Sequence, residues 1–257
     1  MVASLNCSRM DVNMVMLDRL AGRSVAEAHV MDYELILFDA DGTLFDYDRA
    51  ERHALEKACR MHRLEYSERL LERYRKINSA LWRQLEEGFI TSAEIRVERF
   101  RSLLCELGLD AASAPELAQD YLSHLAQGAY LIDGAEEICR YLAPNYRLAI
   151  LTNGIQEVQT SRFQASPLVP YFDRLIISEE VGFSKPRPEI FEYAMNALGH
   201  RCRSTTMIVG DSLTSDMRGG INYGIATCWY NPQARENDMG LEVDHEIYSL
   251  DQLGRIL

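Results

Sequence analysis

The sequence predicts an α/β protein with a doubly wound parallel sheet and an inserted group of helices. Short apolar runs, uniform on both faces, alternate along the chain with segments of helical periodicity. Such runs are typical of parallel strands that helices cover on both sides. Their alternation with helices specifies βαβ units with right-handed crossovers. The expected strands are residues 35–38, 148–151, 175–177, 207–209 and 225–229.

The gap between the first two expected strands is much longer than the other gaps. Apolar residues at three- and four-residue spacing fill this gap and predict helices, at residues 51–63, 67–87, 92–107 and 115–127. We therefore expect a catalytic core of residues 32–47 and 129–257 and a helical cap of residues 48–128. An insertion after the first strand stands over the carboxyl ends of the strands, so the cap can act as a lid.

The composition limits the classes of function. The 257 residues carry a net charge of -12, which argues against a nucleic-acid or anionic-membrane surface. No segment approaches the roughly 20 continuous apolar residues of a membrane span. The six cysteines lie far apart and are typical of reduced thiols in a cytoplasmic protein. We expect residues 1–31 to be a poorly ordered N-terminal extension, and the sequence does not indicate an oligomeric state.

Four polar motifs follow expected strands or lie in the loop after one. Because parallel strands end at one edge of the sheet, residues after them converge on one crevice. In chain order the motifs are Asp39-Ala40-Asp41-Gly42-Thr43, Thr152-Asn153-Gly154, Lys185-Pro186 and Gly210-Asp211-Ser212-Leu213-Thr214-Ser215-Asp216.

The first motif carries two carboxylates suited to successive steps of phosphate-ester hydrolysis. Asp39 and Asp41 are two residues apart, so a continued strand would point both to the same side. One carboxylate can attack phosphorus and form an aspartyl-phosphate. The other can protonate the leaving oxygen and then deprotonate water. Crowded carboxylates need a counter-charge, which Mg²⁺ supplies, with Asp211 as the third protein ligand.

The remaining motifs supply groups that stabilise an anionic phosphate. Lys185 provides a positive charge and Thr152 a hydroxyl, while Asn153 and Gly154 offer backbone N–H groups at an expected helix start. Each motif alone is more often a turn, a helix cap or a helix breaker. Their common position after strands favours one shared site that binds a small-molecule phosphomonoester.

These motifs resemble those of the haloacid dehalogenase superfamily, and the resemblance spans residues 32–229. It implies a Rossmann-like core with a helical cap, Asp39 as the nucleophile and Asp41 as the general acid and base. Superfamily members that cleave carbon–halogen bonds lack a carboxylate at the position of Asp41. The presence of Asp41 therefore favours phosphoryl transfer.

The resemblance also implies a metal site and a substrate class. Mg²⁺ would be bound by Asp39, the backbone carbonyl of Asp41 and Asp211, with Asp216 supporting the metal or Lys185. A closer resemblance is to bacterial house-cleaning pyrimidine 5′-nucleotidases. The shared stretches are residues 38–45, 90–92, 177–182, 219–222 and 226–229.

The sequence therefore predicts a magnesium-dependent phosphomonoesterase that acts on nucleoside 5′-monophosphates, preferentially dUMP, UMP and dTMP. Trp82 and Phe89 of the cap are candidates for stacking on the base, although aromatic residues on amphipathic helices are usually core. The first alternative is a phosphatase for another small metabolite, such as phosphoglycolate or a sugar phosphate. A phosphomutase and a catalytically silent binding or regulatory module are further alternatives.

Overall fold

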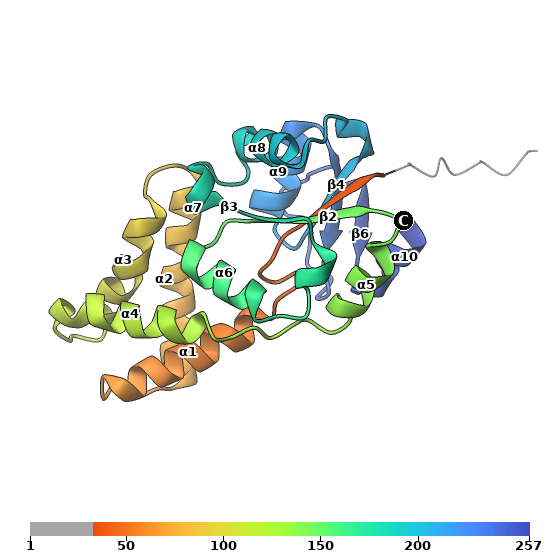
Figure 1. Ribbon diagram of the computed structural model, residues 1–257. Helices are drawn as coiled ribbons and strands as arrows, with labels where there is room; N and C mark the ends of the chain where they lie inside the picture. The colour runs from red at the N-terminus through yellow and green to blue at the C-terminus, as the bar shows by residue number, and fades with distance from the viewer. Residues whose placement is uncertain (1–32) are drawn as a thin grey trace, which may run out of the picture. The chain divides into compact units, whose positions relative to one another are not determined.

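The computed structural model describes residues 33–257, and within them six strands form one parallel sheet. The expected N-terminal extension, residues 1–31, lies outside the described residues. The strands are Leu35–Phe38 (β1), Arg147–Thr152 (β2), Arg174–Ile177 (β3), Thr206–Gly210 (β4), Ala226–Tyr230 (β5) and His245–Ile247 (β6). Their order in the sheet is β3-β2-β1-β4-β5-β6, that of a doubly wound Rossmann-like fold (Figure 1). The predicted fold class is thus confirmed.

One strand was not expected from the sequence. β6 pairs with β5 in parallel, with Cys228 opposite His245 and Tyr230 opposite Ile247. It has only three residues, two of them polar, and lies at the edge of the sheet. Such a strand has no apolar run to reveal it, because only one of its residues is buried.

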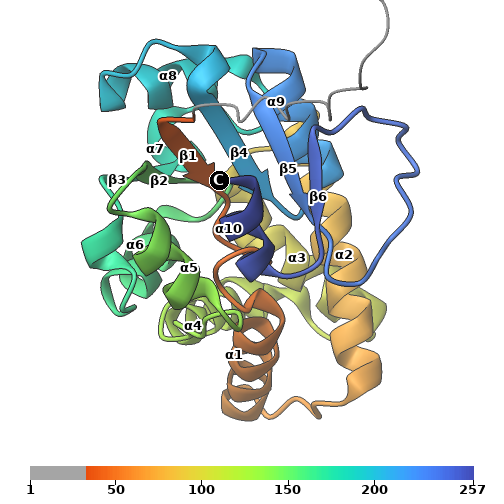
Figure 2. The same cartoon turned by 90° about the vertical axis from the view of Figure 1, so that its right-hand side faces the viewer.

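Helices cover both faces of the sheet, as alternating side chains of the strands require (Figure 2). Ile36 and Phe38 of β1 pack on one face with the helices at residues 135–142 and 253–256. Leu35 and Leu37 pack on the other face with the helices at residues 188–198 and 218–223. The core helices are Ala135–Leu142 (α5), Gln156–Gln164 (α6), Ser178–Val181 (α7), Pro188–Leu198 (α8), Arg218–Tyr223 (α9) and Leu253–Ile256 (α10). The first face thus belongs to α5 and α10 and the second to α8 and α9.

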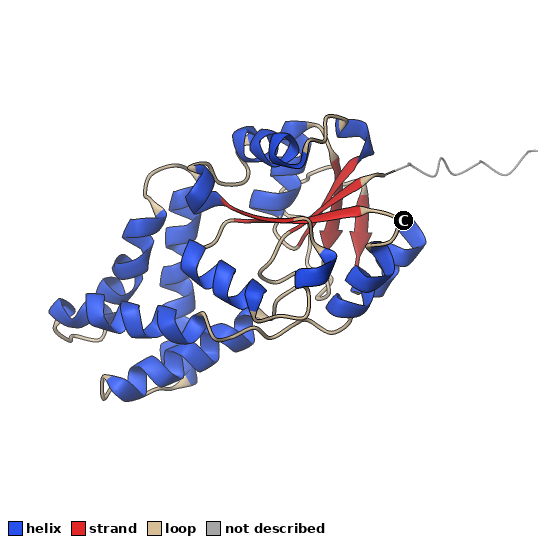
Figure 3. Cartoon of the chain, in the orientation of Figure 1, coloured by secondary structure: helices blue, strands red, loops and turns tan. Residues whose placement is uncertain are grey.

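Four helices fill the long gap between β1 and β2, and they lie together at the left of Figure 1. Side-chain caps begin three of them. Asp46 accepts a hydrogen bond from the backbone N–H of Arg49, Ser67 accepts one from that of Leu70, and Thr91 and Glu94 form a capping box. The four helices share one apolar cluster. Their bounds are Tyr47–Met61 (α1), Glu68–Glu86 (α2), Ser92–Glu106 (α3) and Ala114–Leu125 (α4), and Figure 3 shows them in blue.

Short helical turns complete the described chain. A π-helical turn, Leu213–Met217, follows β4 directly and carries part of the fourth polar motif. The 3₁₀ turns are Ala111–Ser113, Val169–Tyr171, Arg203–Thr205 and Leu250–Gln252. Among the described residues, no helix combines the length and apolar character that crossing a membrane requires.

A charged cluster joins the inserted helices to the sheet domain. Arg96 of α3 donates to both carboxylate oxygens of Glu179 in α7, at 3.0 and 2.9 Å, and Ser92 donates to the same carboxylate at 3.0 Å. Glu179 also accepts the backbone N–H of Gln156, at the first turn of α6. Burial raises the pKa of Glu179, but the hydrogen bonds from Gln156 and Arg96 outweigh it and lower the pKa below its usual value. Glu179 therefore ties α3 to the beginning of α6 as a carboxylate.

Candidate active site

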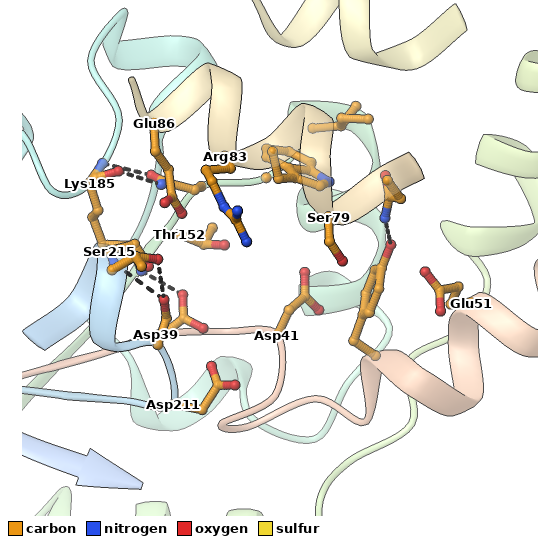
Figure 4. A pocket seen from close by; sticks show the side chains of 18 of the residues that line it. Asp39, Asp41, Glu51, Ser79, Arg83, Glu86, Thr152, Lys185, Asp211 and Ser215 are labelled. Atoms are coloured by element: carbon orange, nitrogen blue, oxygen red, sulfur yellow. Dashed lines mark hydrogen bonds and ion pairs between the residues drawn. The ribbon is translucent and has the colours of Figure 1, made fainter. Parts of the chain in front are cut away.

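A cavity of about 580 Å³ lies between the strand ends and the inserted helices, and Figure 4 shows it from close by. Its walls come from two sources. The strand ends and the loops after them contribute, among others, Asp39, Asp41, Thr152, Lys185 and Asp211. The inserted helices contribute, among others, Tyr47, Asn78, Ser79, Trp82 and Arg99.

The ammonium of Lys185 lies at the centre of the polar strand ends. Its Nζ lies 2.5 Å from Asp39 Oδ1, 2.6 Å from Asp216 Oδ1 and 2.6 Å from the backbone oxygen of Leu151. The contacts with Asp39 and Leu151 are hydrogen bonds, and the contact with Asp216 is an ion pair. Burial lowers the pKa of Lys185, but the charges of Asp216 and Asp39 outweigh it and raise the pKa well above its usual value. Lys185 therefore stays charged although it is 1% exposed.

Three carboxylates meet beside this lysine and fit a divalent cation. One oxygen each of Asp39, Asp211 and Asp216 lies within 4.8 Å of the others. Burial, followed by the charge of Asp216, raises the pKa of Asp211 to about 7. Burial also raises the pKa of Asp39 well above its usual value. A hard cation with oxygen ligands would relieve this repulsion, so the donor set suits Mg²⁺.

Asp41 lines the cavity, but its side chain lies outside this group of three. Its Oδ1 accepts a hydrogen bond from Arg162 Nη1 and its Oδ2 accepts one from Gln159 Nε2, each at 2.5 Å. Arg162 also donates to the backbone oxygen of Gly128, at 3.1 Å. Two donors from α6 thus orient the Asp41 carboxylate.

The second motif, Thr152-Asn153-Gly154, lies at the end of β2, and its three residues make different contacts. Thr152 lines the cavity and is buried. Asn153 uses its side chain to hold the loop of Lys185, because its Nδ2 donates to the Lys185 oxygen at 2.7 Å and its Oδ1 accepts the Lys185 N–H at 2.8 Å. Within the described residues, the N–H groups of Asn153 and Gly154 donate to no protein acceptor, and helix α6 begins two residues later. These two N–H groups remain available to a bound anion.

The two aromatic candidates of the cap differ in position. Trp82 of α2 is among the residues that line the cavity. Phe89 follows α2, is 75% exposed and is not among the lining residues. Trp82 is therefore the one of the two that can contact a molecule in the cavity.

Several residues near the site were not singled out from the sequence, among them two in α6 and one in the loop after β5. Gln159 and Arg162 share the buried side of α6 with Val158, so this helix lacks a regular apolar stripe that would set off its functional face. Their spacing of three residues, in the helix that follows the second motif, is the signal that could have found them. Arg235 lies in the loop after β5 and donates to the backbone oxygen of Asp211 at 2.8 Å. Nothing in the sequence of that loop indicates this contact.

The fold and the site together define an α/β protein with a doubly wound parallel sheet and a carboxylate, Asp39, directly after its strand β1. A family model of haloacid dehalogenase-like hydrolases matches residues 33–224. The chain therefore belongs to the haloacid dehalogenase-like hydrolases, and it is an enzyme. The predicted family is thus confirmed.

Several relatives match nearly the whole of their own length. The HAD-hydrolase YfnB of Bacillus subtilis is 37% identical over 88% of this chain and 95% of its own. The pyrimidine 5′-nucleotidase YjjG of Escherichia coli is 34% identical over 88% of this chain and 99% of its own. The pyrimidine 5′-nucleotidase PynA of Streptococcus pneumoniae is 36% identical over 87% and 94%, respectively.

Solved structures show the same fold. The magnesium-bound crystal structure of YfnB from Bacillus subtilis matches with a TM-score of 0.82 and 37% identity, over 88% of this chain and 98% of that one. L-2-haloacid dehalogenase from Xanthobacter autotrophicus matches with a TM-score of 0.69 and 21% identity, over 87% and 98%. The second likeness shows the fold alone.

We predict that Asp41 and Arg162 are energetically coupled. Replacing Arg162 by Met should destabilise the wild type more than it destabilises the Asp41→Asn variant, because only the wild type then keeps a carboxylate without its cationic partner. The coupling energy should be about 1–3 kcal/mol. Urea unfolding of the wild type, both single variants and the double variant measures it. The lost contacts to Gly128 and Phe45 are common to both backgrounds and cancel. Additive destabilisation would contradict the prediction.

Proposed function

We propose that this protein is a magnesium-dependent phosphomonoesterase that hydrolyses nucleoside 5′-monophosphates, preferentially UMP, dUMP and dTMP, through an aspartyl-phosphate on Asp39. The observation that carries the proposal is the placement of Asp39. Its carboxylate is held by Lys185 at the wall of a cavity that Asp41 also lines. A fixed carboxylate with a second one nearby matches a two-step displacement at phosphorus.

In the first step, Asp39 attacks the phosphorus and the ester oxygen leaves. Lys185 holds Asp39 Oδ1, and within the described residues no hydrogen bond uses Oδ2, which is therefore the oxygen available for attack. Thr152, Asn153 and Gly154 line the cavity, and the Thr152 hydroxyl and the two backbone N–H groups are proposed to donate to the phosphoryl oxygens and stabilise their charge. The lysine adds positive charge to the same place.

Asp41 is proposed to move the protons in both steps. As an acid it protonates the leaving oxygen, and as a carboxylate it then removes a proton from the water that attacks the aspartyl-phosphate. Its two donors, Arg162 and Gln159, fix its direction and leave it at the cavity wall. Arg162 and Gln159 are therefore positioning residues in this proposal.

The proposed metal ligands are Asp39, Asp211 and the backbone carbonyl of Asp41, with Asp216 in support through Lys185. When bound, Mg²⁺ supplies positive charge that offsets the charge of the transferring phosphoryl group. Two observations support the proposal: the three clustered carboxylates, and the magnesium-bound structure of the relative YfnB.

Pyrimidine nucleotides are proposed as substrates on the basis of relatives and cavity size. YjjG and PynA, both more than 30% identical over almost their whole length, are named pyrimidine 5′-nucleotidases. The cavity volume of about 580 Å³ lies within the range of roughly 300–1,000 Å³ that is usual for small-molecule sites. The cavity therefore accepts a ligand larger than a bare two-carbon phosphate ester.

Magnesium should stabilise the folded protein as well as activate it. A ligand that binds only the folded state at 100 times its Kd adds about 2.7 kcal/mol to stability, and this should appear as a higher Tm. Asp211→Asn should remove most of the increase, whereas Asp238→Asn, at an exposed site, should keep it. Thermal unfolding with and without Mg²⁺ measures the effect. EDTA should stop phosphate release reversibly, and full activity in EDTA would disprove the metal site.

The two aspartates should fail at different steps. Asp39→Asn should abolish turnover and any burst of product with little loss of stability, because an amide is nearly isosteric with a carboxylate but does not attack phosphorus. Asp41→Asn should still release a burst of nitrophenol from p-nitrophenyl phosphate, since this leaving group needs little acid catalysis, and then turn over slowly. Rapid-quench and stopped-flow assays separate the two phases. A burst from Asp39→Asn would refute the nucleophile assignment.

The substrate class is tested by comparing kcat/KM across phosphate esters. The kcat/KM values for UMP, dUMP and dTMP should be higher than those for AMP, GMP, phosphoglycolate and glucose 6-phosphate. Nucleoside di- and triphosphates should be poor substrates. A pocket that selects one ring over two by fit alone discriminates by only about 1–3 kcal/mol, so the preference over purines should be tenfold to a few hundredfold. If phosphoglycolate or a purine nucleotide is the best substrate, the pyrimidine assignment is wrong and the phosphatase chemistry stands.

A further inference from the structure

The cap contains a buried guanidinium with almost no hydrogen-bond partners. Arg99 of α3 is 1% exposed, and its Nε and Nη2 have no partner in the described part of the chain. Its one hydrogen bond within residues 33–257 is long, 3.5 Å from Nη1 to Asn78 Oδ1. Burying a charge without partners is costly. Hydrogen bonding within the cap therefore does not account for the burial of Arg99.

The carboxylate of Glu51, whose charge acts on Arg99, forms its ion pair with Arg75. The buried carboxylate of Glu51 accepts a hydrogen bond from Arg75 Nε at 2.6 Å, so it is already paired. The other polar neighbours are tyrosines, and burial raises the pKa of Tyr74 and Tyr121 well above the usual value. These hydroxyls are therefore neutral, and within residues 33–257 Arg99 forms no ion pair.

Aromatic packing fixes the guanidinium but leaves its donors free. The guanidinium carbon lies 4.8 Å from the ring centre of Tyr121 and 5.6 Å from that of Phe100. Stacking of this kind uses the face of the guanidinium, whereas the N–H groups lie along its edge. Arg99 is thus held in place with donors directed away from the rings.

Arg99 lines the same cavity as the carboxylates of the strand ends, and its Nε and Nη2 are buried beside that cavity. Arg99 and Asn78 line it from the cap side, together with Trp82, whereas Asp39 and Lys185 line it from the core side. Lys185 lies beside the proposed phosphate position, so the phosphate already has its cation. A molecule that fills the cavity from Asp39 to the cap presents the part remote from its phosphate to Arg99 and Asn78.

We propose that Arg99, with Asn78, binds a carbonyl oxygen of the nucleobase and so determines the substrate preference. The inference rests on the proposed nucleotidase function and adds the residues that recognise the base. A guanidinium only donates, so its partner must be an acceptor. Every pyrimidine base carries a ring carbonyl oxygen, and uracil and thymine carry two. The side chain of Asn78, which is 5% exposed, offers a second polar group beside it.

The test compares two substrates that differ only by the base, UMP and ribose 5-phosphate. Arg99→Met keeps an unbranched side chain as far as the position of Nε and removes every donor. It should lower kcat/KM for UMP by about 10- to 100-fold, the loss expected for hydrogen bonds from a charged group. The value for ribose 5-phosphate should stay within about twofold of wild type. Arg99→Lys should restore part of the loss for UMP, because it keeps the charge without the planar arrangement of donors.

A matched control lies on the same helix. Arg101 is exposed and forms an ion pair with Glu98, so Arg101→Met should leave kcat/KM unchanged for both substrates. If Arg99 only packs the cap, Arg99→Met will lower kcat/KM equally for both substrates or for neither of them. Either result overturns the proposal. If Arg99→Met does not fold, inhibition by uridine tests the proposal instead. Uridine should inhibit ribose 5-phosphate hydrolysis by Arg99→Lys at least several-fold more weakly than by wild type, and an unchanged inhibition constant rejects the proposal.

The wild-type enzyme separates this inference from the function on which it rests. If wild type does not prefer UMP to ribose 5-phosphate, the nucleotidase function fails and base recognition fails with it. If wild type prefers UMP and Arg99→Met keeps that preference, only the role of Arg99 is wrong.

Discussion

The buried ammonium of Lys185 is the interaction on which the site depends. It joins Asp39 after β1, the Leu151 oxygen in β2 and Asp216 in the turn after β4, so that three neighbouring strands share one cation. Removing it would leave two buried carboxylates without a counter-charge, and breaking such a buried pair costs about 3–5 kcal/mol. Because Asn153 holds the Lys185 backbone from both sides, the lysine is positioned by the end of β2. These contacts are made by the protein alone, without a ligand.

The order of the strands in the sheet explains how residues far apart in the chain meet in this site. β1 is central and pairs with β2 on one side and β4 on the other, so Asp39 meets partners from both neighbours. Lys185 is 146 residues from Asp39 in the chain and still reaches it, because parallel crossovers return each strand end to the same edge. The long insertion after β1 does not disturb this edge. It adds a second wall, which Glu179 fastens to the core through Arg96 and Ser92.

Sequence patterns predicted the parts of the structure whose signal is local. The apolar runs of β1 to β5 and the polar residues directly after them are local features, and so are the periodicities of α1 to α4. β6 has no such run, and its place is fixed by pairing with β5. Arg99 and Arg162 were missed for a related reason, because a charged residue on a helix is normally solvated, whereas both are buried. Only tertiary packing shows which face of α3 or α6 they occupy.

The buried cations are distinguished by how many of their donors the protein uses. Lys185 makes two hydrogen bonds and one ion pair within the core, which hold it in the site. Arg162 donates to Asp41 and Gly128 through Nη1 and Nε, and its Nη2 has no partner in the described part of the chain. Arg99 has one long contact and two groups without partners. A buried cation is costly when most of its donors are unused, unless a ligand completes it. Of these three cations Arg99 uses the fewest donors in the described part of the chain, so it is the one assigned to the substrate.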